Sequence, residues 1–170
     1  MPLLKILLFP DPRLRTVAKA VTTIDEEILS LTKAMLNTMY EGNGIGLAAT
    51  QVNVHKRVIV IDVSEEKDNP LVLINPQVSI INNEDKISSE EGCLSVPGFY
   101  EEVERPNKVE ITYQNLKGEK IDIIPSGLQS VVIQHEIDHL NGKVFVDYLS
   151  SVKRDMIKKK LLKGKTKKNK

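Results

Sequence analysis

Two histidines four residues apart, with a glutamate directly after the first, are the residues of this sequence whose types and spacing best suit metal binding and catalysis. They are His135, Glu136 and His139, in the run QHEIDHL. Residues i and i+4 of a helix lie on one face, so both imidazoles can reach a single metal ion. The carboxylate projects about 100° further around the helix axis, where it can contact a water on that ion. The pattern therefore predicts a metal site with hydrolytic chemistry.

The segment that carries these residues is expected to be a buried helix over about 126–141, ended by Gly142. Leu128, Val131 and Val132 share the histidine face, whereas Ile133, Ile137 and Leu140 lie roughly opposite. A helix that is apolar on both sides is normally buried, and a buried, rigid helix would hold metal ligands in a fixed geometry. The alternative, two surface histidines on an amphipathic helix, fits this pattern poorly.

Cys93, the only cysteine, is the candidate for a third ligand and lies in the run EEGCLSVP. A lone cysteine is more often a small buried hydrophobe. A site with two histidines needs a third protein ligand, however, and thiolates bind zinc and ferrous iron well. Gly92 beside it would let another backbone approach closely. Three protein ligands leave the fourth coordination position open for water, as a catalytic site requires.

A third segment, residues 44–51 (GIGLAATQ), is rich in small side chains. Such residues suit tight packing or the close approach of a peptide backbone. The segment lacks the further glycine or the lysine of phosphate-binding loops. A packed turn after the preceding helix is an equally good interpretation of the spacing alone.

Composition places these motifs in one soluble domain of 170 residues, 41% of them hydrophobic. One cysteine cannot form an internal disulfide. Pro10 and Pro12 interrupt the apolar N-terminal run, so we expect no signal peptide, and no apolar stretch approaches the roughly 20 residues that span a bilayer. The expected location is the cytoplasm.

Charge is distributed unevenly along the chain. Residues 153–170 hold ten Lys or Arg and one acid, a net charge of +9, whereas residues 1–152 carry −8. A basic segment of this kind either docks on nucleic acid or another anionic surface or forms a solvated tail, and charge alone does not separate the two.

Local signals give the remaining elements. Asp11-Pro12 is expected to open a short helix, and Asp25 to cap a longer one that ends at residues 42–44 (GNG). A last helix is expected over about 151–162. Five runs have the composition of β-strands: residues 57–63, 71–75, 77–81, 108–113 and 121–124.

The motifs GIGLAATQ, EGCLS and QHEIDH together make the chain resemble the bacterial form of the peptide deformylase family. That family has three signature motifs of this kind, in this order and at similar separations. The resemblance covers most of the chain, including residues 11–15 (DPRLR), 73–76 (LINP) and 142–145 (GKVF). The chain departs from the family at Ser89, where an apolar residue is common, and in the variable loop 98–102 (GFYEE).

With this resemblance, the pattern of elements predicts an α+β fold. Mixed or antiparallel sheets would pack around the buried central helix that carries HExxH, with N-terminal helices and a C-terminal helix. We expect residues 1–152 to form a single catalytic domain. Residues 153–170, the basic end of the last helix and its tail, would belong to the same domain.

The resemblance implies a metal-dependent hydrolase that removes the formyl group from the N-formylmethionine of nascent polypeptides. Cys93, His135 and His139 would bind one divalent metal, Fe(II) in the family's physiological form, with zinc, nickel or cobalt able to replace it. A metal-bound hydroxide would attack the formyl carbon. Glu136 would act first as general base and then as general acid.

The same resemblance assigns the surrounding residues. The Gln51 side-chain amide and the Leu94 backbone N–H would stabilise the charge on the formyl oxygen. Ile45 and Gly46 would pair with the substrate backbone as an added strand. The other substrate-binding residues would be Gly92 beside the thiolate and, in the methionine pocket, Leu128, Val131 and Val132.

Outside the site, the predictions concern supporting residues and partners. Asp138 is expected to pair with a cation such as Arg105, in a structural salt bridge by preference, and Glu91 to hydrogen-bond a ligand or the cysteine loop. The family resemblance suggests a monomer that docks near the ribosomal exit tunnel through its basic C-terminal helix, with no membrane partner.

Two other functions remain open at this point. An HExxH zinc endopeptidase would use the same helix, but it gives no role to Cys93 or to GIGLAATQ. A structural metal-binding or nucleic-acid-binding protein would use the basic end, but it leaves Glu136 and the open coordination position without purpose. Release of formate from formyl-Met-Ala-Ser separates the three.

Overall fold

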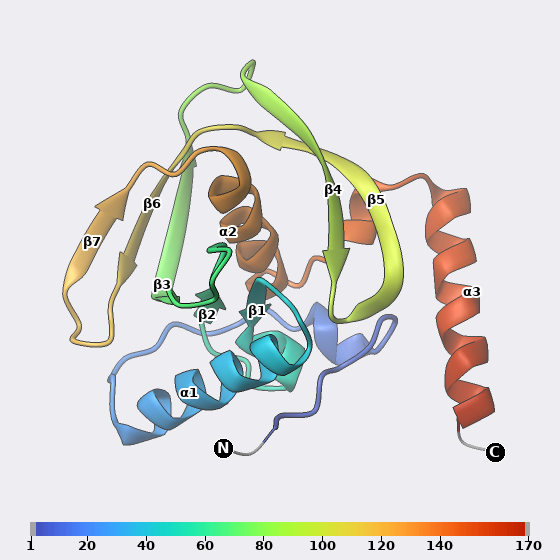
Figure 1. Ribbon diagram of the computed structural model, residues 1–170, viewed down its shortest axis with the longest axis horizontal. Coiled ribbons are helices and arrows are strands. Elements are labelled where there is room, and N and C mark those ends of the chain that lie inside the picture. Colours follow the sequence, from blue (N-terminus) through green and yellow to red (C-terminus); the bar gives the residue numbers. More distant parts are fainter. Residues whose placement is uncertain (1–2, 169–170) are drawn as a thin grey trace.

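The computed structural model describes residues 3–168, with side chains described up to residue 164 (Figure 1). The helices, in chain order, are η1 (Pro12–Arg15), α1 (Glu26–Glu41), η2 (Ala49–Val52), α2 (Gly127–Leu140), η3 (Phe145–Tyr148) and α3 (Ser151–Lys168). The strands are β1 (Gly46–Ala48), β2 (Val58–Ile61), β3 (Leu71–Ile80), β4 (Lys86–Cys93), β5 (Val96–Pro106), β6 (Val109–Gln114) and β7 (Lys120–Ile123).

The strands form two antiparallel sheets. Five of them make one sheet in the order β1-β2-β3-β6-β7, and β4 and β5 form a separate hairpin. Helix α2 lies at the centre, against β1, β2 and β3 of the larger sheet and against β5 of the hairpin (Figure 1). Helix α1 packs on β1 and β2. The expected α+β fold, with antiparallel sheets around a central helix, is confirmed.

Strand β2 shows how sequence produces this layering. All four of its residues are buried, and its side chains alternate between two hydrophobic clusters. Val58 and Val60 face the cluster that contains α1, whereas Ile59 and Ile61 face the cluster that contains α2. Because successive side chains of a strand point to opposite faces, an unbroken apolar run is what a strand covered on both sides requires.

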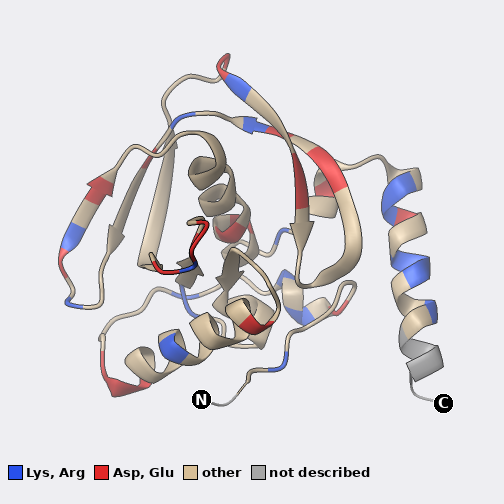
Figure 2. Ribbon diagram, in the orientation of Figure 1, with Lys and Arg blue, Asp and Glu red and all other residues tan. Residues whose placement is uncertain are grey.

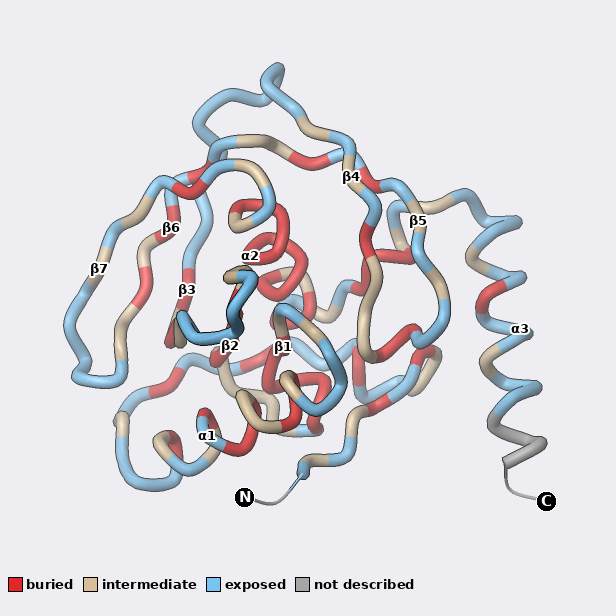
Figure 3. The backbone as a smooth tube through the Cα atoms, in the orientation of Figure 1, coloured by how far each residue is buried: buried red, intermediate tan, exposed pale blue. Residues whose placement is uncertain are grey.

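A third cluster joins the hairpin to the C-terminal helix. Ile157 of α3 is fully buried there, beside Phe145 of η3 and Val103 of β5, and Leu161 packs against the same cluster. Most other described residues of α3 are exposed, in contrast to α2 (Figure 3). Among the described residues, no helix combines the length and the apolar character that crossing a bilayer requires.

Most expected elements form close to their expected bounds, and their caps are as expected. The Asp25 side chain accepts a hydrogen bond from the Ile28 N–H at the start of α1, and Asp11 does the same for Arg13 at η1. Gly142 follows the end of α2 with φ of 78°, a conformation that glycine adopts at little cost.

Three expectations need correction. The sequence pattern separates residues 71–75 from 77–81, but β3 continues through Pro76, and a register shift between Ile74 and Gln77 accommodates the proline. The last helix extends to Lys168, beyond the expected end near residue 162. Strands β1, β4 and β5 have no counterpart among the expected runs.

Candidate metal centre and active-site cleft

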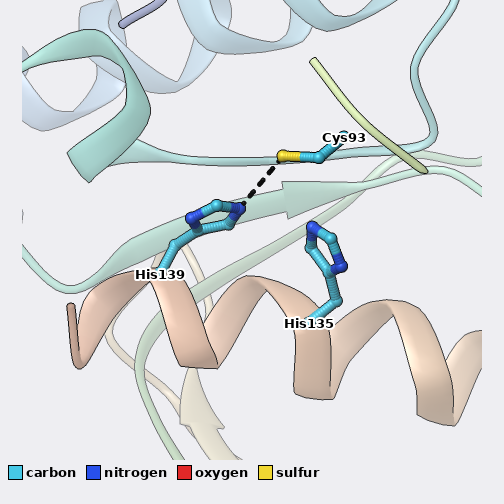
Figure 4. Close-up of side chains that lie close together, drawn as sticks. All are labelled: Cys93, His135 and His139. Carbon is cyan, nitrogen blue, oxygen red and sulfur yellow. Dashed lines mark hydrogen bonds between the residues drawn. The ribbon is translucent and has the colours of Figure 1, made fainter. Parts of the chain in front are cut away.

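Cys93, His135 and His139 converge from two elements that are far apart in the sequence. The histidines project from one face of α2 toward Cys93 (Figure 4). Cys93 is the last residue of β4, at the tight turn into β5. Their possible ligand atoms all lie within 4.8 Å of one another. Both histidines are buried, and Cys93 is partly buried. The structure thus brings together the three residues that the sequence proposes as ligands.

The geometry fits a divalent cation. In a tetrahedral site with zinc-like bond lengths, neighbouring sulfur and nitrogen ligand atoms lie roughly 3.3–3.6 Å apart. The Cys93 Sγ and His139 Nε2 atoms are 3.3 Å apart. The Oε2 atom of Glu136 is buried beside this group without a hydrogen-bond partner in the described structure. A buried carboxylate oxygen without a partner indicates a polar ligand that the protein alone does not supply.

Glu136 lies in an environment that favours its neutral form. It is 3% exposed, and its Oε1 atom is 3.7 Å from His135 Nε2. Burial raises the pKa of Glu136 to about 7, although the positive charges of His135 and Arg105 act in the opposite direction. A carboxyl group with a pKa near 7 can both accept and return a proton at neutral pH.

Each histidine of α2 has its own electrostatic surroundings. Burial, together with nearby positive charge, lowers the pKa of His139 well below its ordinary value, which leaves a neutral ring. Burial also acts to lower the pKa of His135, but hydrogen bonds with Cys93 and Glu91 raise it above the ordinary value. Because metal binding requires the neutral ring, a cation on Nε2 would displace the proton held there.

Glu91 supports His135 from behind. Its Oε1 atom is 2.9 Å from His135 Nδ1, which leaves Nε2 directed at the site. Glu91 also forms a bidentate pair with Arg105, and Arg105 reaches Asp138 at 2.9 Å. The expected pairing of Asp138 with Arg105 is therefore present, as is the expected hydrogen bond between Glu91 and a candidate ligand.

Gln51 is buried beside Cys93. Its Oε1 atom accepts a hydrogen bond from the Ala48 N–H, and its Nε2 atom is 3.0 Å from Ser95 Oγ and 3.4 Å from Cys93 Sγ. Ser95, fully buried, is a residue that sequence reasoning missed. Its place two residues after the cysteine, in the EGCLS motif, was the available signal.

A cleft of about 460 Å³ opens beside these residues. All the expected substrate-binding residues line this cleft, together with Leu94, one candidate base and two candidate ligands. The residues are Ile45, Gly46, Gly92, Leu94, Leu128, Val131, Val132, Cys93, His135 and Glu136. Phe99 and Tyr100, from the loop where the sequence departs from the family, also line it. Tyr100 lies against Gly92 so closely that a Cβ atom there would meet its ring at 2.4 Å.

One wall of the cleft is the edge of the larger sheet. Strand β1 pairs with β2 on one side and stands at the end of the strand order. Gly46 of this strand lies close to Glu136, since a Cβ atom on Gly46 would be 3.0 Å from Glu136 Oε1. An edge strand offers unpaired backbone groups to an extended peptide, and glycine allows its close approach.

Comparison with known proteins agrees with this geometry. The sequence pattern of the family described as polypeptide deformylase matches residues 3–155. The chain belongs to the polypeptide deformylase family. It is 58% identical over 161 residues to a peptide deformylase of Teredinibacter turnerae, with 95% of each chain covered, and 57% identical, with the same coverage, to that of Pseudomonas aeruginosa.

Solved structures of peptide deformylases have the same fold. The Ehrlichia chaffeensis enzyme in complex with actinonin matches with a TM-score of 0.92 and 40% identity, covering 96% of this chain and 98% of its own. The Legionella pneumophila enzyme matches with a TM-score of 0.91 and 43% identity, covering 99% of both chains. Family membership confirms the expectation that the chain is an enzyme of the deformylase class.

Proposed function

We propose that this deformylase removes the formyl group from N-formylmethionyl peptides, with Cys93, His135 and His139 holding the metal and Glu136 transferring protons. The observation that carries this proposal is the convergence of three ligand atoms and one buried carboxylate beside a cleft bordered by an edge strand. A cation held there would act as a Lewis acid and lower the pKa of a coordinated water toward neutrality.

Glu136 would take a proton from the attacking water and later return it to the departing amine. Its burial and its pKa near 7 support both steps. The Leu94 N–H and one N–H of the Gln51 amide would donate to the formyl oxygen as negative charge develops on it. Ser95 Oγ holds that amide in place at 3.0 Å. Loss of one such donor typically costs about 10²–10³ in rate.

The substrate would enter as an extended strand along β1. Ile45 and Gly46 would pair with its backbone, and Gly92, against which Tyr100 packs, would line its path. Leu128, Val131 and Val132 of α2 would surround the methionine side chain, which suits their place on the histidine face of the helix. The proposed metal is Fe(II), as the family resemblance implies, and a sulfur with two nitrogen ligands suits ferrous iron as well as zinc.

The decisive experiment measures formate released from formyl-Met-Ala-Ser by protein purified without oxygen, with the metal content of the same sample determined in parallel. We expect formate and free Met-Ala-Ser in equal amounts, one metal per chain, and loss of activity after chelation. Cleavage of the Met-Ala bond instead would indicate an endopeptidase. Metal without any turnover would indicate a structural site, and either result would overturn the proposal.

We also propose that α3 docks this enzyme on the ribosome, which would place it beside nascent formylated chains in the cytoplasm. The exposed lysines of α3 support this proposal, because a helix dense in positive charge suits a surface rich in RNA phosphate (Figure 2).

A further inference from the structure

A continuous series of contacts leads from the candidate ligand His135 to Tyr148, a residue on the molecular surface. His135 Nδ1 is 2.9 Å from Glu91 Oε1, and Glu91 receives two hydrogen bonds from Arg105, at 2.6 and 3.0 Å. Arg105 also donates to Asp138 Oδ2 at 2.9 Å. The same Oδ2 atom accepts a hydrogen bond of 2.7 Å from the Tyr148 hydroxyl.

The inner part of this series is buried and charged. Arg105 and Glu91 are 3% and 5% exposed, so each must satisfy its charge within the protein. Burial acts to lower the pKa of Arg105, but the hydrogen bonds and charges of Glu91 and Asp138 raise it above its ordinary value. The guanidinium is therefore a fixed cation between two carboxylates. Its orientation determines where the Glu91 oxygens point.

Tyr148 holds Arg105 in two ways. Its ring lies under the guanidinium, with the Arg105 Cζ atom 4.9 Å from the ring centroid. Its hydroxyl binds the Asp138 oxygen that receives the other arm of the guanidinium. Because a planar guanidinium has a rigid set of donors, fixing one edge and one face fixes the edge that binds Glu91.

We propose that Tyr148 is a positioning residue for the metal ligand His135, acting through Asp138, Arg105 and Glu91. The role rests on the proposed function, because it assumes that His135 binds the metal through Nε2. Glu91 on Nδ1 sets the ring's orientation and its available nitrogen, and groups that hold a ligand in this way commonly change metal affinity 10–100-fold. Tyr148 extends the supporting network to η3, outside the three sequence motifs.

The test compares Zn(II) dissociation constants, measured by competition with a chromogenic chelator, for wild type and Tyr148→Phe. The substitution keeps the ring under Arg105 and removes only the hydroxyl. We expect about three- to tenfold weaker binding, less than the 10–100-fold loss expected for Glu91→Gln, which acts directly on the ligand. Absorption of the Co(II)-loaded proteins, which reports ligand geometry, should shift in both variants.

Tyr40→Phe is the matched control. Tyr40 donates to Asp62 Oδ2 at 2.5 Å, and the pKa of either tyrosine is raised to about 12 by burial and a carboxylate partner. Both variants therefore lose the same kind of hydrogen bond, but Tyr40 packs against the hydrophobic cluster that contains α1 and bonds Asp62, which is outside the network from His135 to Tyr148. We expect Tyr40→Phe to lower thermal stability and to leave Zn(II) affinity and the Co(II) spectrum unchanged.

A double-mutant cycle shows whether Tyr148 acts through Glu91. With Glu91→Gln already present, Tyr148→Phe should have little further effect on Zn(II) affinity. Asp138→Asn replaces Glu91→Gln in the cycle if the latter does not fold. Unchanged affinity and spectrum in Tyr148→Phe, or full additivity in the cycle, would overturn the role of Tyr148. Failure of the wild-type protein to bind Zn(II) or Co(II) would instead count against the proposed function itself.

Discussion

At the scale of single residues, burial accounts for the unusual chemistry of the site. Glu136 is a carboxyl group with little access to water, and one of its oxygens has no hydrogen-bond partner in the described structure. Burying such a group is costly for folding unless a polar ligand in the cleft completes its hydrogen bonds. Gly46 lies next to this group, since a Cβ atom on Gly46 would be 3.0 Å from Glu136 Oε1. The raised pKa that results from this burial is useful if the carboxyl group exchanges protons with a water in the cleft.

Glu136→Ala should therefore keep the metal and lose turnover. We expect formate release from formyl-Met-Ala-Ser to fall by about 10²–10⁴, the usual contribution of general acid–base catalysis, with metal content unchanged. Glu110→Ala, which removes an exposed glutamate from β6, is the control and should behave as wild type. Equal activity in Glu136→Ala and wild type would refute the assignment of Glu136 as the base.

The candidate ligands and Glu136 could be predicted because their signals are local. His135, Glu136 and His139 lie on one helix whose period is visible in the sequence, and Cys93 is the only cysteine. Tyr148 and Ser95 could not be assigned roles in this way. Each acts through partners far away in the sequence or through packing, and a tyrosine or serine has many ordinary roles. Only the folded chain shows which partner each one contacts.

At the scale of elements, α2 and β2 were predictable and the hairpin was not. Inward-facing positions of β5 alternate with exposed ones, but one of them is Arg105, which pairs with Glu91 of β4. A buried ion pair hides the apolar alternation that would mark a half-buried strand. Pro97 and Gly98 further weaken the β signal at the start of β5. The same charged pair that supports the site thus conceals the strands that carry it.

The junction after α2 provides a test at this scale. Gly142 has φ of 78°, and a Cβ atom there would lie 2.6 Å from the backbone oxygen of Arg15. Gly118 has a similar φ of 82° but meets only Ile24 Cδ1, at 3.9 Å. Gly118→Ala should lower the free energy of unfolding by about 1–2 kcal/mol, the cost of a left-handed backbone. Gly142→Ala should lower the free energy of unfolding by clearly more, because the backbone at Arg15 must move as well.

Urea unfolding measures the free energy of unfolding of both variants. Because both glycines have a left-handed backbone, the difference between the two losses reports the close approach of η1 to the end of α2. Equal losses in the two variants would mean that the Arg15 backbone shifts freely, and that η1 does not restrain the end of the helix that carries His139.

At the scale of the whole molecule, α3 lies beside β5 (Figure 1). Ile157 is buried in the third hydrophobic cluster. Lys153 pairs with Glu101 at 3.0 Å, and Lys160 lies 6.0 Å from the centre of the Phe99 ring. Removal of the whole helix would therefore disturb packing as well as charge. A test of docking should change the exposed lysines and keep these attachments.

The triple variant Lys158→Glu, Lys159→Glu, Lys163→Glu meets this requirement, because all three lysines are exposed. We expect it to co-sediment with ribosomes far less than wild type at low salt, and to deformylate formyl-Met-Ala-Ser normally. The matched control reverses the exposed Lys33, Lys117 and Lys120, which gives the same change in net charge elsewhere on the surface.

Salt provides the second arm of this experiment. Docking through lysines releases counterions from RNA phosphates, so wild-type binding should weaken steeply as salt rises, whereas the α3 variant should bind weakly throughout. Equal loss in the α3 variant and in the control would show that net charge alone governs association. Equal retention in both would exclude the lysines of α3 as the docking surface. Only a loss of ribosome binding that is confined to the α3 variant supports a docking site on this helix. The cleft is the same in all three proteins, and the two variants have the same net charge.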